Sequence, residues 1–89
     1  MKTKLILIVS MLTLAPQVYA KKNCTSEPKS KWMNESDFKA QMIKKGYKIR
    51  KFKQPGTCYE IYGQNPKGEK VEVYFNPVTA EVVKSEIDD

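Results

Sequence analysis

The chain has 89 residues, with 16 Lys plus Arg against 10 Asp plus Glu and no His, so its formal net charge is +6. A chain of this length forms one small domain at most. Without His, it lacks both the usual general base near neutral pH and the commonest transition-metal ligand, which excludes Ser-His-Asp triads and His-containing zinc sites. We therefore expect a protein that is not an enzyme and that needs no cofactor or metal.

Residues 1–20 are typical of a signal peptide. Lys2 and Lys4 precede a largely apolar run from Leu5 to Leu14, and Val18-Tyr19-Ala20 offers small residues where a signal peptidase cuts. The alternative is a retained membrane anchor, but the apolar run is about half of the roughly 20 residues that a spanning helix needs. We expect an exported chain that begins at Lys21, has net charge +4 and makes no stable membrane insertion after cleavage.

Cys24 and Cys58 are the two cysteines of the chain. In an oxidising compartment, two cysteines in so short a chain most simply pair with each other. Their bond would close a loop of 35 residues, which stabilises the fold by about 3–4 kcal/mol in the chain-entropy model. The competing interpretations are a redox-active pair or an intermolecular bridge, although no C-x-x-C motif marks either thiol as activated.

The exported chain divides into three segments. Residues 21–31 are polar and lack an apolar period, so we expect an irregular arm there. Residues 32–86 carry the periodic patterns of a folded domain, and residues 87–89 are expected to fray.

A helix is predicted from Glu35 to Lys45. Asn34 is a good N-cap residue, and Gly46 can adopt the left-handed conformation that ends a helix. Three apolar residues are expected to form its buried stripe: Phe38, Met42 and Ile43.

The remainder predicts antiparallel strands. They are expected at residues 47–53, 58–63, 70–75 and 81–84, with turns at 54–57 and 76–80. Apolar residues change phase between Ile49 and Phe52, which indicates a bulge near Arg50 or Lys51. The predicted fold is α+β, with one N-terminal helix packed on a small antiparallel sheet of three to four strands and fastened by one disulfide.

The turn between the second and third predicted strands sets their register. A three-residue loop ending at Gly68 pairs Asn65 with Glu69. Counting outward places Ile61 opposite Val73 and Tyr59 opposite Phe75 on the face that the helix covers. On the other face, it places Tyr62 opposite Glu72 and Glu60 opposite Tyr74.

One candidate site is a basic segment around the first strand. Six cations lie within ten residues: Lys44, Lys45, Lys48, Arg50, Lys51 and Lys53. They could bind an anionic polymer or a membrane surface, whereas export makes a nucleic-acid partner unexpected. The alternative is a solvated basic strand that protects the edge of the sheet, with Lys51 opposite Glu60.

The second candidate site is the sheet face away from the helix. It is expected to carry Tyr62, Tyr74, Glu60, Lys70 and Glu72. Exposed tyrosines on a rigid sheet are common in recognition surfaces. Alternatively, the arm covers this face and buries Trp32 against the tyrosines. We expect Glu60 and Glu72 to pair with neighbouring lysines rather than to form an acid/base couple.

Three segments of the chain resemble the PepSY domain family. Residues 58–63 and 68–83 are similar to its paired strands and to its D-P-x-T-G-E-V ending, and Trp32 to Glu35 with Phe38 resembles the helix of its short secreted branch. The resemblance implies a bacterial periplasmic or secreted module without catalytic residues. Family members are proposed to regulate or inhibit peptidases, so the expected partner is a peptidase or another envelope protein.

The sequence departs from the family pattern at two positions in the last turn. Asn76 replaces the usual Asp, and Asn can still serve as the first residue of a turn. Ala80 replaces the usual Gly, and the left-handed conformation disfavours a residue with a Cβ by about 1 kcal/mol or more. We therefore expect a strained or altered turn.

Overall fold

The computed structural model of the chain describes residues 22–88, so the expected signal peptide lies outside the described residues. The elements are η1 (Lys29–Lys31), α1 (Glu35–Lys44), β1 (Lys48–Lys53), β2 (Tyr59–Gln64), β3 (Lys70–Phe75) and β4 (Val82–Ile87). The strands form one antiparallel sheet in the order β1-β2-β3-β4, so β1 and β4 are its edges. The α+β fold is confirmed, although the short η1 turn precedes α1.

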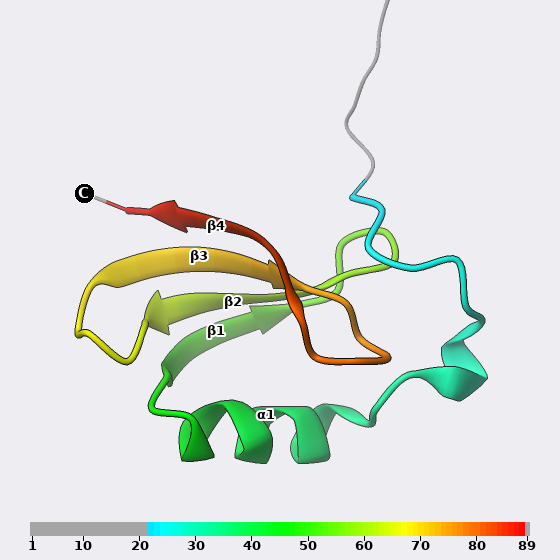
Figure 1. The fold of residues 1–89 in the computed structure, drawn as a ribbon, viewed down its shortest axis with the longest axis horizontal. Coiled ribbons are helices and arrows are strands. Elements are labelled where there is room, and N and C mark those ends of the chain that lie inside the picture. Colours follow the sequence, from blue (N-terminus) through cyan, green and yellow to red (C-terminus); the bar gives the residue numbers. More distant parts are fainter. Residues whose placement is uncertain (1–21, 89) are drawn as a thin grey trace, which may run out of the picture.

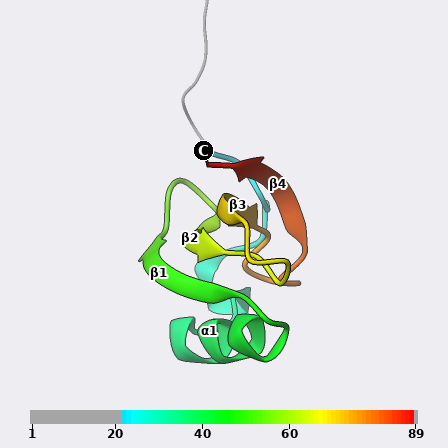
Figure 2. The same ribbon diagram turned by 90° about the vertical axis from the view of Figure 1, so that its left-hand side faces the viewer.

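Helix α1 covers one face of the sheet (Figure 1). In this view and in the perpendicular one of Figure 2, β4 is the strand farthest from α1. No helix within residues 22–88 is long and apolar enough to cross a membrane.

The ends of α1 follow the expected capping. Asn34 Oδ1 accepts a hydrogen bond from the Asp37 amide at 2.8 Å, and Gly46 has φ +106° just after the helix. Phe38 and Met42 are fully buried, but Ile43 is 59 % exposed, so its expected place in the core was wrong. Ile43 lies about 140° around the helix from Phe38, because each residue turns the helix by about 100°.

Phe38 is at the centre of the core. Its ring lies 4.9 Å from Tyr59, 5.1 Å from Phe75 and 6.0 Å from Phe52, between ring centroids. Edge-to-face and tilted contacts of this kind are favourable for aromatic rings. Buried aliphatic residues complete the layer between helix and sheet: Met42, Ile61, Val71 and Val73.

The register between β2 and β3 is the predicted one. Ile61 lies opposite Val73, and Tyr62 lies opposite Glu72. The connecting loop also has the expected geometry, because Asn65 donates its amide to the Glu69 carbonyl and Gly68 has φ +86°. The alternating pattern and the turn chemistry were therefore sufficient to define this hairpin.

The predicted bulge in β1 is confirmed, since the register shifts between Ile49 and Lys51. The pairing beyond it differs from the expectation: Lys53, not Lys51, lies opposite Glu60, and Lys51 lies opposite Tyr62. The reason is a turn that the Cys58 amide closes onto the Pro55 carbonyl. This turn keeps residues 54–59 out of the β1–β2 ladder and shifts the pairing by two residues.

The bulge lies against Gly63 of β2. A Cβ built on Gly63 would be 1.8 Å from the Lys48 carbonyl oxygen, so only glycine allows the β1 backbone to approach this closely. We expect Gly63→Ala to lower the free energy of unfolding by about 2–3 kcal/mol through overpacking. Gly68→Ala is the control, because its Cβ would meet nothing within 4 Å and only the positive φ opposes it, at about 1 kcal/mol. Urea unfolding of both variants tests this, and an equal or smaller loss for Gly63→Ala would contradict it.

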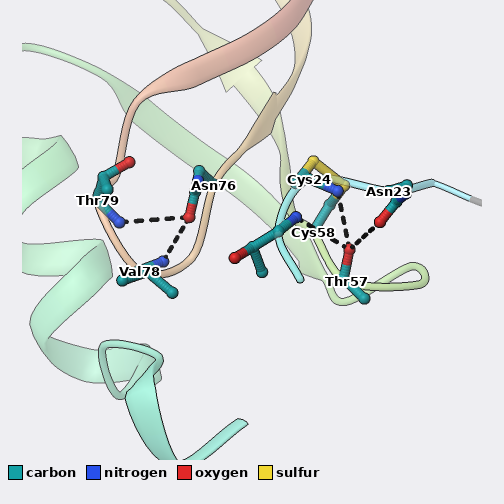
Figure 3. Close-up of a disulfide and its surroundings, with 8 residues drawn as sticks. Asn23, Cys24, Thr57, Cys58, Asn76, Val78 and Thr79 are labelled. Atoms are coloured by element: carbon teal, nitrogen blue, oxygen red, sulfur yellow. Dashed lines mark hydrogen bonds between the residues drawn. A yellow bond between two sulfur atoms is a disulfide. The ribbon is translucent and has the colours of Figure 1, made fainter. Parts of the chain in front are cut away.

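The turn before β4 has the conformation that the sequence suggested. Ala80 has φ +66°, as expected for the position where the family pattern has Gly. Asn76 Oδ1 accepts the Val78 amide at 2.8 Å and the Thr79 amide at 3.4 Å, so Asn serves as the first residue of the turn (Figure 3).

Strand β4 is longer than predicted. It continues past Lys84 to Ile87, and the Asp88 amide donates to the Lys70 carbonyl at 2.8 Å. Ile87 therefore belongs to the sheet rather than to a frayed tail, and Asp88 is bonded to the sheet through its amide.

Candidate functional site

The arm that leads into the domain is fastened to the start of β2. The predicted Cys24–Cys58 disulfide is present, with the two Cα atoms 5.0 Å apart. Beside it, Thr57 Oγ1 accepts the Cys24 amide at 2.8 Å and the Thr25 amide at 3.2 Å (Figure 3). The Thr57 amide donates to the Lys22 carbonyl at 2.9 Å. Covalent and hydrogen bonds thus fix the same point of the arm.

Trp32 lies on the helix side of the sheet. Its ring packs edge-to-face on Tyr59 at 5.6 Å, and the Tyr59 hydroxyl donates to the Met33 carbonyl. The alternative in which Trp32 is buried against Tyr62 and Tyr74 is therefore wrong. Trp32 packs on Tyr59 because alternation along β2 directs Tyr59 toward the helix, whereas Tyr62 points to the opposite face.

We call the sheet face away from α1 the outer face. By strand alternation and pairing it carries Glu60, Tyr62 and Gln64 of β2, Lys70, Glu72 and Tyr74 of β3, Lys48, Lys51 and Lys53 of β1, and Lys84 and Glu86 of β4. The outer face therefore includes the whole predicted tyrosine site and half of the predicted basic segment.

The two tyrosines of the outer face are covered by lysines. The Nζ atoms of Lys51 and Lys53 lie 5.3 Å and 5.5 Å from the centroid of the Tyr62 ring. Lys22 of the arm lies 4.9 Å from the centroid of the Tyr74 ring. These distances are within the range of cation–π attraction. The face is thus partly covered, by lysine side chains and the start of the arm.

The six cations of the basic segment do not form one patch. Lys48, Lys51 and Lys53 lie on the outer face, whereas Lys44 and Lys45 are at the end of α1, in the other layer of the fold. Arg50 is the additional residue of the bulge. Sequence reasoning missed Lys84, whose face follows only from the β4 register, and Lys22, for which the sequence carries no signal.

Two carboxyl groups lie beneath the lysines. The hydroxyls of Tyr74 and Tyr62 both donate to Glu72 Oε2, at 2.8 Å and 3.2 Å. Glu60 is 3 % exposed, and its Oε2 has no hydrogen-bond partner among the described residues. The ion pairs within residues 22–88 are Lys39–Glu35 and Lys84–Glu86. The expectation that lysines neutralise Glu60 and Glu72 was therefore wrong.

Glu60 and Glu72 are coupled to each other instead. Burial, followed by interaction with Glu72, raises the pKa of Glu60, and the neighbouring Glu60 carboxyl lowers the pKa of Glu72. The two shifts belong to the pair, and their directions mean that Glu60 takes up a proton more readily than Glu72. The pair raises the pKa of Tyr62 to about 12, chiefly through the hydrogen bond with Glu60, so Tyr62 remains a donor.

This coupling predicts an effect of pH on stability. The pKa of Glu60 is raised above its ordinary value of 4.5, so folding favours its protonated form and the protein loses stability as pH rises from about 4.5 through the folded-state pKa. Glu60→Gln keeps a neutral donor that does not titrate. We expect this variant to be more stable than the wild type at pH 8 by about 1 kcal/mol, the order of an unsatisfied buried group, and to lose less stability between pH 5 and 8.

Urea unfolding at pH 5 and pH 8 measures the effect. Glu81→Gln is the control, because Glu81 is exposed in the turn before β4. The prediction is contradicted if the stability of Glu60→Gln falls with pH as steeply as that of the wild type and the control.

Residues 22–88 contain no cluster of three or more side chains able to hold a metal ion.

Comparisons with curated proteins and with solved structures found no significant match. The family model described as "Peptidase propeptide and YPEB domain" matches residues 4–86, nearly the whole chain. The chain therefore belongs to this family, PepSY_2.

Proposed function

We propose that the protein is an exported, non-enzymatic module that regulates a peptidase or another envelope protein by binding it. Membership of the peptidase propeptide and YPEB domain family supports a regulatory role. The disulfide and the leader-like residues 1–20 support a periplasmic or secreted location. The inaccessibility of Glu60, one of the two coupled carboxyls, argues against a role for this pair in chemistry on a substrate.

The outer face is the surface that we assign to the partner. The observation that carries this assignment is the β1 bulge, which directs Lys51 and Lys53 to the same face as Tyr62. Six lysines lie on the outer face or over its tyrosines: Lys22, Lys48, Lys51, Lys53, Lys70 and Lys84. Three acidic residues share the face with them: Glu60, Glu72 and Glu86.

This charge pattern favours an acidic partner surface. Complementary charges speed association and reject partners of the wrong sign. The lysines over Tyr62 are also ordered before binding by their contact with the ring, which reduces the entropy lost when a partner orders them.

A pair of double variants tests the assignment. Lys51→Gln/Lys53→Gln changes the outer face, and Lys44→Gln/Lys45→Gln removes the same charge from the end of α1. Each immobilised protein is used to capture partners from periplasmic extract, and its effect on peptidase activity in that extract is measured. We expect the outer-face variant to lower capture and peptidase regulation about tenfold, the sum of two surface charge contacts. Equal loss in both variants would reject the outer face.

The second candidate function is binding to an anionic polymer or membrane surface, and the same six lysines favour it. It predicts binding to heparin or to vesicles rich in phosphatidylglycerol that weakens steeply as salt is raised. Absent or salt-independent binding would reject this function and leave a protein partner.

A further inference from the structure

Strand β4 is an edge with little protection against pairing. All six of its residues are exposed, and the apolar side chains of Val83 and Ile87 are 52 % and 54 % exposed. Edge strands are usually blocked by charges, proline or bulges. The other edge, β1, has a bulge in its middle and four cations, whereas β4 lacks proline and its register shift lies at its start.

The hydrogen bonds of β4 define which backbone groups are free. The Asp88 amide donates to the Lys70 carbonyl, so these two residues form a hydrogen-bonded pair. Bonded and non-bonded pairs alternate along an antiparallel ladder. The backbone groups of Lys84 and Glu86 therefore point to β3, and those of Ser85 and Ile87 point to the open edge.

These free groups restrict how another strand could pair. A second β4 strand can pair antiparallel with the first so that Ser85 of one copy lies opposite Ser85 of the other. The outward backbone groups of the two strands then form hydrogen bonds with each other. In this register Lys84 lies opposite Glu86 of the second copy, twice by symmetry, and Val83 lies opposite Ile87. A register centred on Lys84 would oppose two lysines, and one centred on Glu86 would oppose two glutamates, which is unfavourable.

Glu86 adds an independent reason for this register. It lies opposite Glu72 across the β3–β4 ladder, so a like charge is already beside it. Within β4, Lys84 Nζ is 3.3 Å from Glu86 Oε2. Lys84 of a second copy would bring a further cation to the open side of Glu86 and offset the repulsion from Glu72.

We propose that the occupant of this edge is a second copy of the chain, and that two β4 strands pair antiparallel about Ser85 to form a two-fold dimer. The sheet then continues across both copies, with both outer faces on the same side. The interface is formed by one short strand from each copy, so the dimer is reversible and concentration-dependent. The dimer leaves Lys51 and Lys53 free and does not depend on the function proposed above.

Charge exchange tests the register. In a dimer of Lys84→Glu, glutamates at positions 84 and 86 face each other in both cross-strand pairs. In a dimer of Glu86→Lys, lysines occupy both positions of each pair. Sedimentation equilibrium should show that each single variant associates about tenfold more weakly than the wild type, since two cross-strand pairs change from attraction to repulsion. Mixing the two single variants, or combining both changes in one chain, restores opposite charges and should restore association. A monomeric wild type, or single variants that are not rescued, would overturn the proposal.

Proline at the symmetry axis provides a second measurement. Ser85→Pro removes the outward amide without removing a bond to β3, and proline is tolerated on edge strands for this reason. Ser85→Ala retains the amide and is the matched control. We expect only the proline variant to be monomeric. Because Ser85→Pro leaves Lys51 and Lys53 unchanged, partner capture by this monomeric variant tests the proposed function separately.

Discussion

Replacing Phe38 by Ala is expected to lower the free energy of unfolding by about 3–5 kcal/mol. Phe38 is fully buried in α1, and its ring contacts Tyr59, Phe52 and Phe75 from three different strands. The substitution removes these contacts and leaves a cavity between the two layers. A domain of this size has about 3–10 kcal/mol in total, so most of the stability would be lost.

Phe38→Leu distinguishes a specific packing effect from a general loss of the helix. Leucine retains most of the apolar volume and a high helix propensity, so we expect a much smaller loss than for alanine. Urea unfolding can be followed by the fluorescence of Trp32, the single tryptophan, which packs on Tyr59. A loss below about 1 kcal/mol for Phe38→Ala would contradict the position of Phe38 at the centre of the core.

The second large effect is expected from removal of the disulfide. Cys24→Ala/Cys58→Ala opens a loop with a sequence separation of 34 residues and should lower the free energy of unfolding by about 3–4 kcal/mol in the chain-entropy model. Alanine avoids placing a hydroxyl at the buried position of Cys58. The hydrogen bonds around Thr57 remain, but they close the same loop without a covalent bond.

Reductant provides the control for this prediction. Dithiothreitol should bring the wild type close to the stability of the double variant and should leave the variant unchanged. The prediction is contradicted if the wild type and the variant unfold at the same urea concentration without reductant. It is also contradicted if the reductant destabilises the variant.

The hairpin of β2 and β3 could be predicted because its determinants are local. Gly68 favours one loop geometry, and that geometry brings Ile61 and Val73 to the same face, as the alternating pattern also requires. Asn34 and Gly46 similarly define the ends of α1 through contacts within a few residues. Where turn chemistry and apolar pattern agree, the sequence is sufficient to predict the element and its register.

Features that depend on distant contacts could not be predicted in the same way. The pairing of Lys53 with Glu60 depends on how many residues the turn at Pro55 removes from the ladder. The length of β4 depends on the Asp88 bond to Lys70, for which the apolar pattern gives no signal. Ile43 fits the apolar pattern of the helix, yet it is 59 % exposed because it lies about 140° around α1 from Phe38.

The outer face has one property that the sequence predicts and one that depends on distant contacts. Alternation correctly placed Tyr62, Tyr74, Glu60 and Glu72 on one face, since this requires only the strand period. Their chemical state depends on what lies over them. Burial gives Glu60 a raised pKa and couples it to Glu72, and this burial results from the packing of side chains that are distant in sequence.

The central claim, that a protein partner binds the outer face, is tested most directly by photo-crosslinking from single positions. A benzoyl-phenylalanine introduced at Lys51 lies on the outer face, and one introduced at Lys44 lies at the end of α1. After irradiation in periplasmic extract, we expect a discrete crosslinked protein from position 51 and none from position 44. Crosslinking from position 44 alone, or equally from both positions, would contradict the claim.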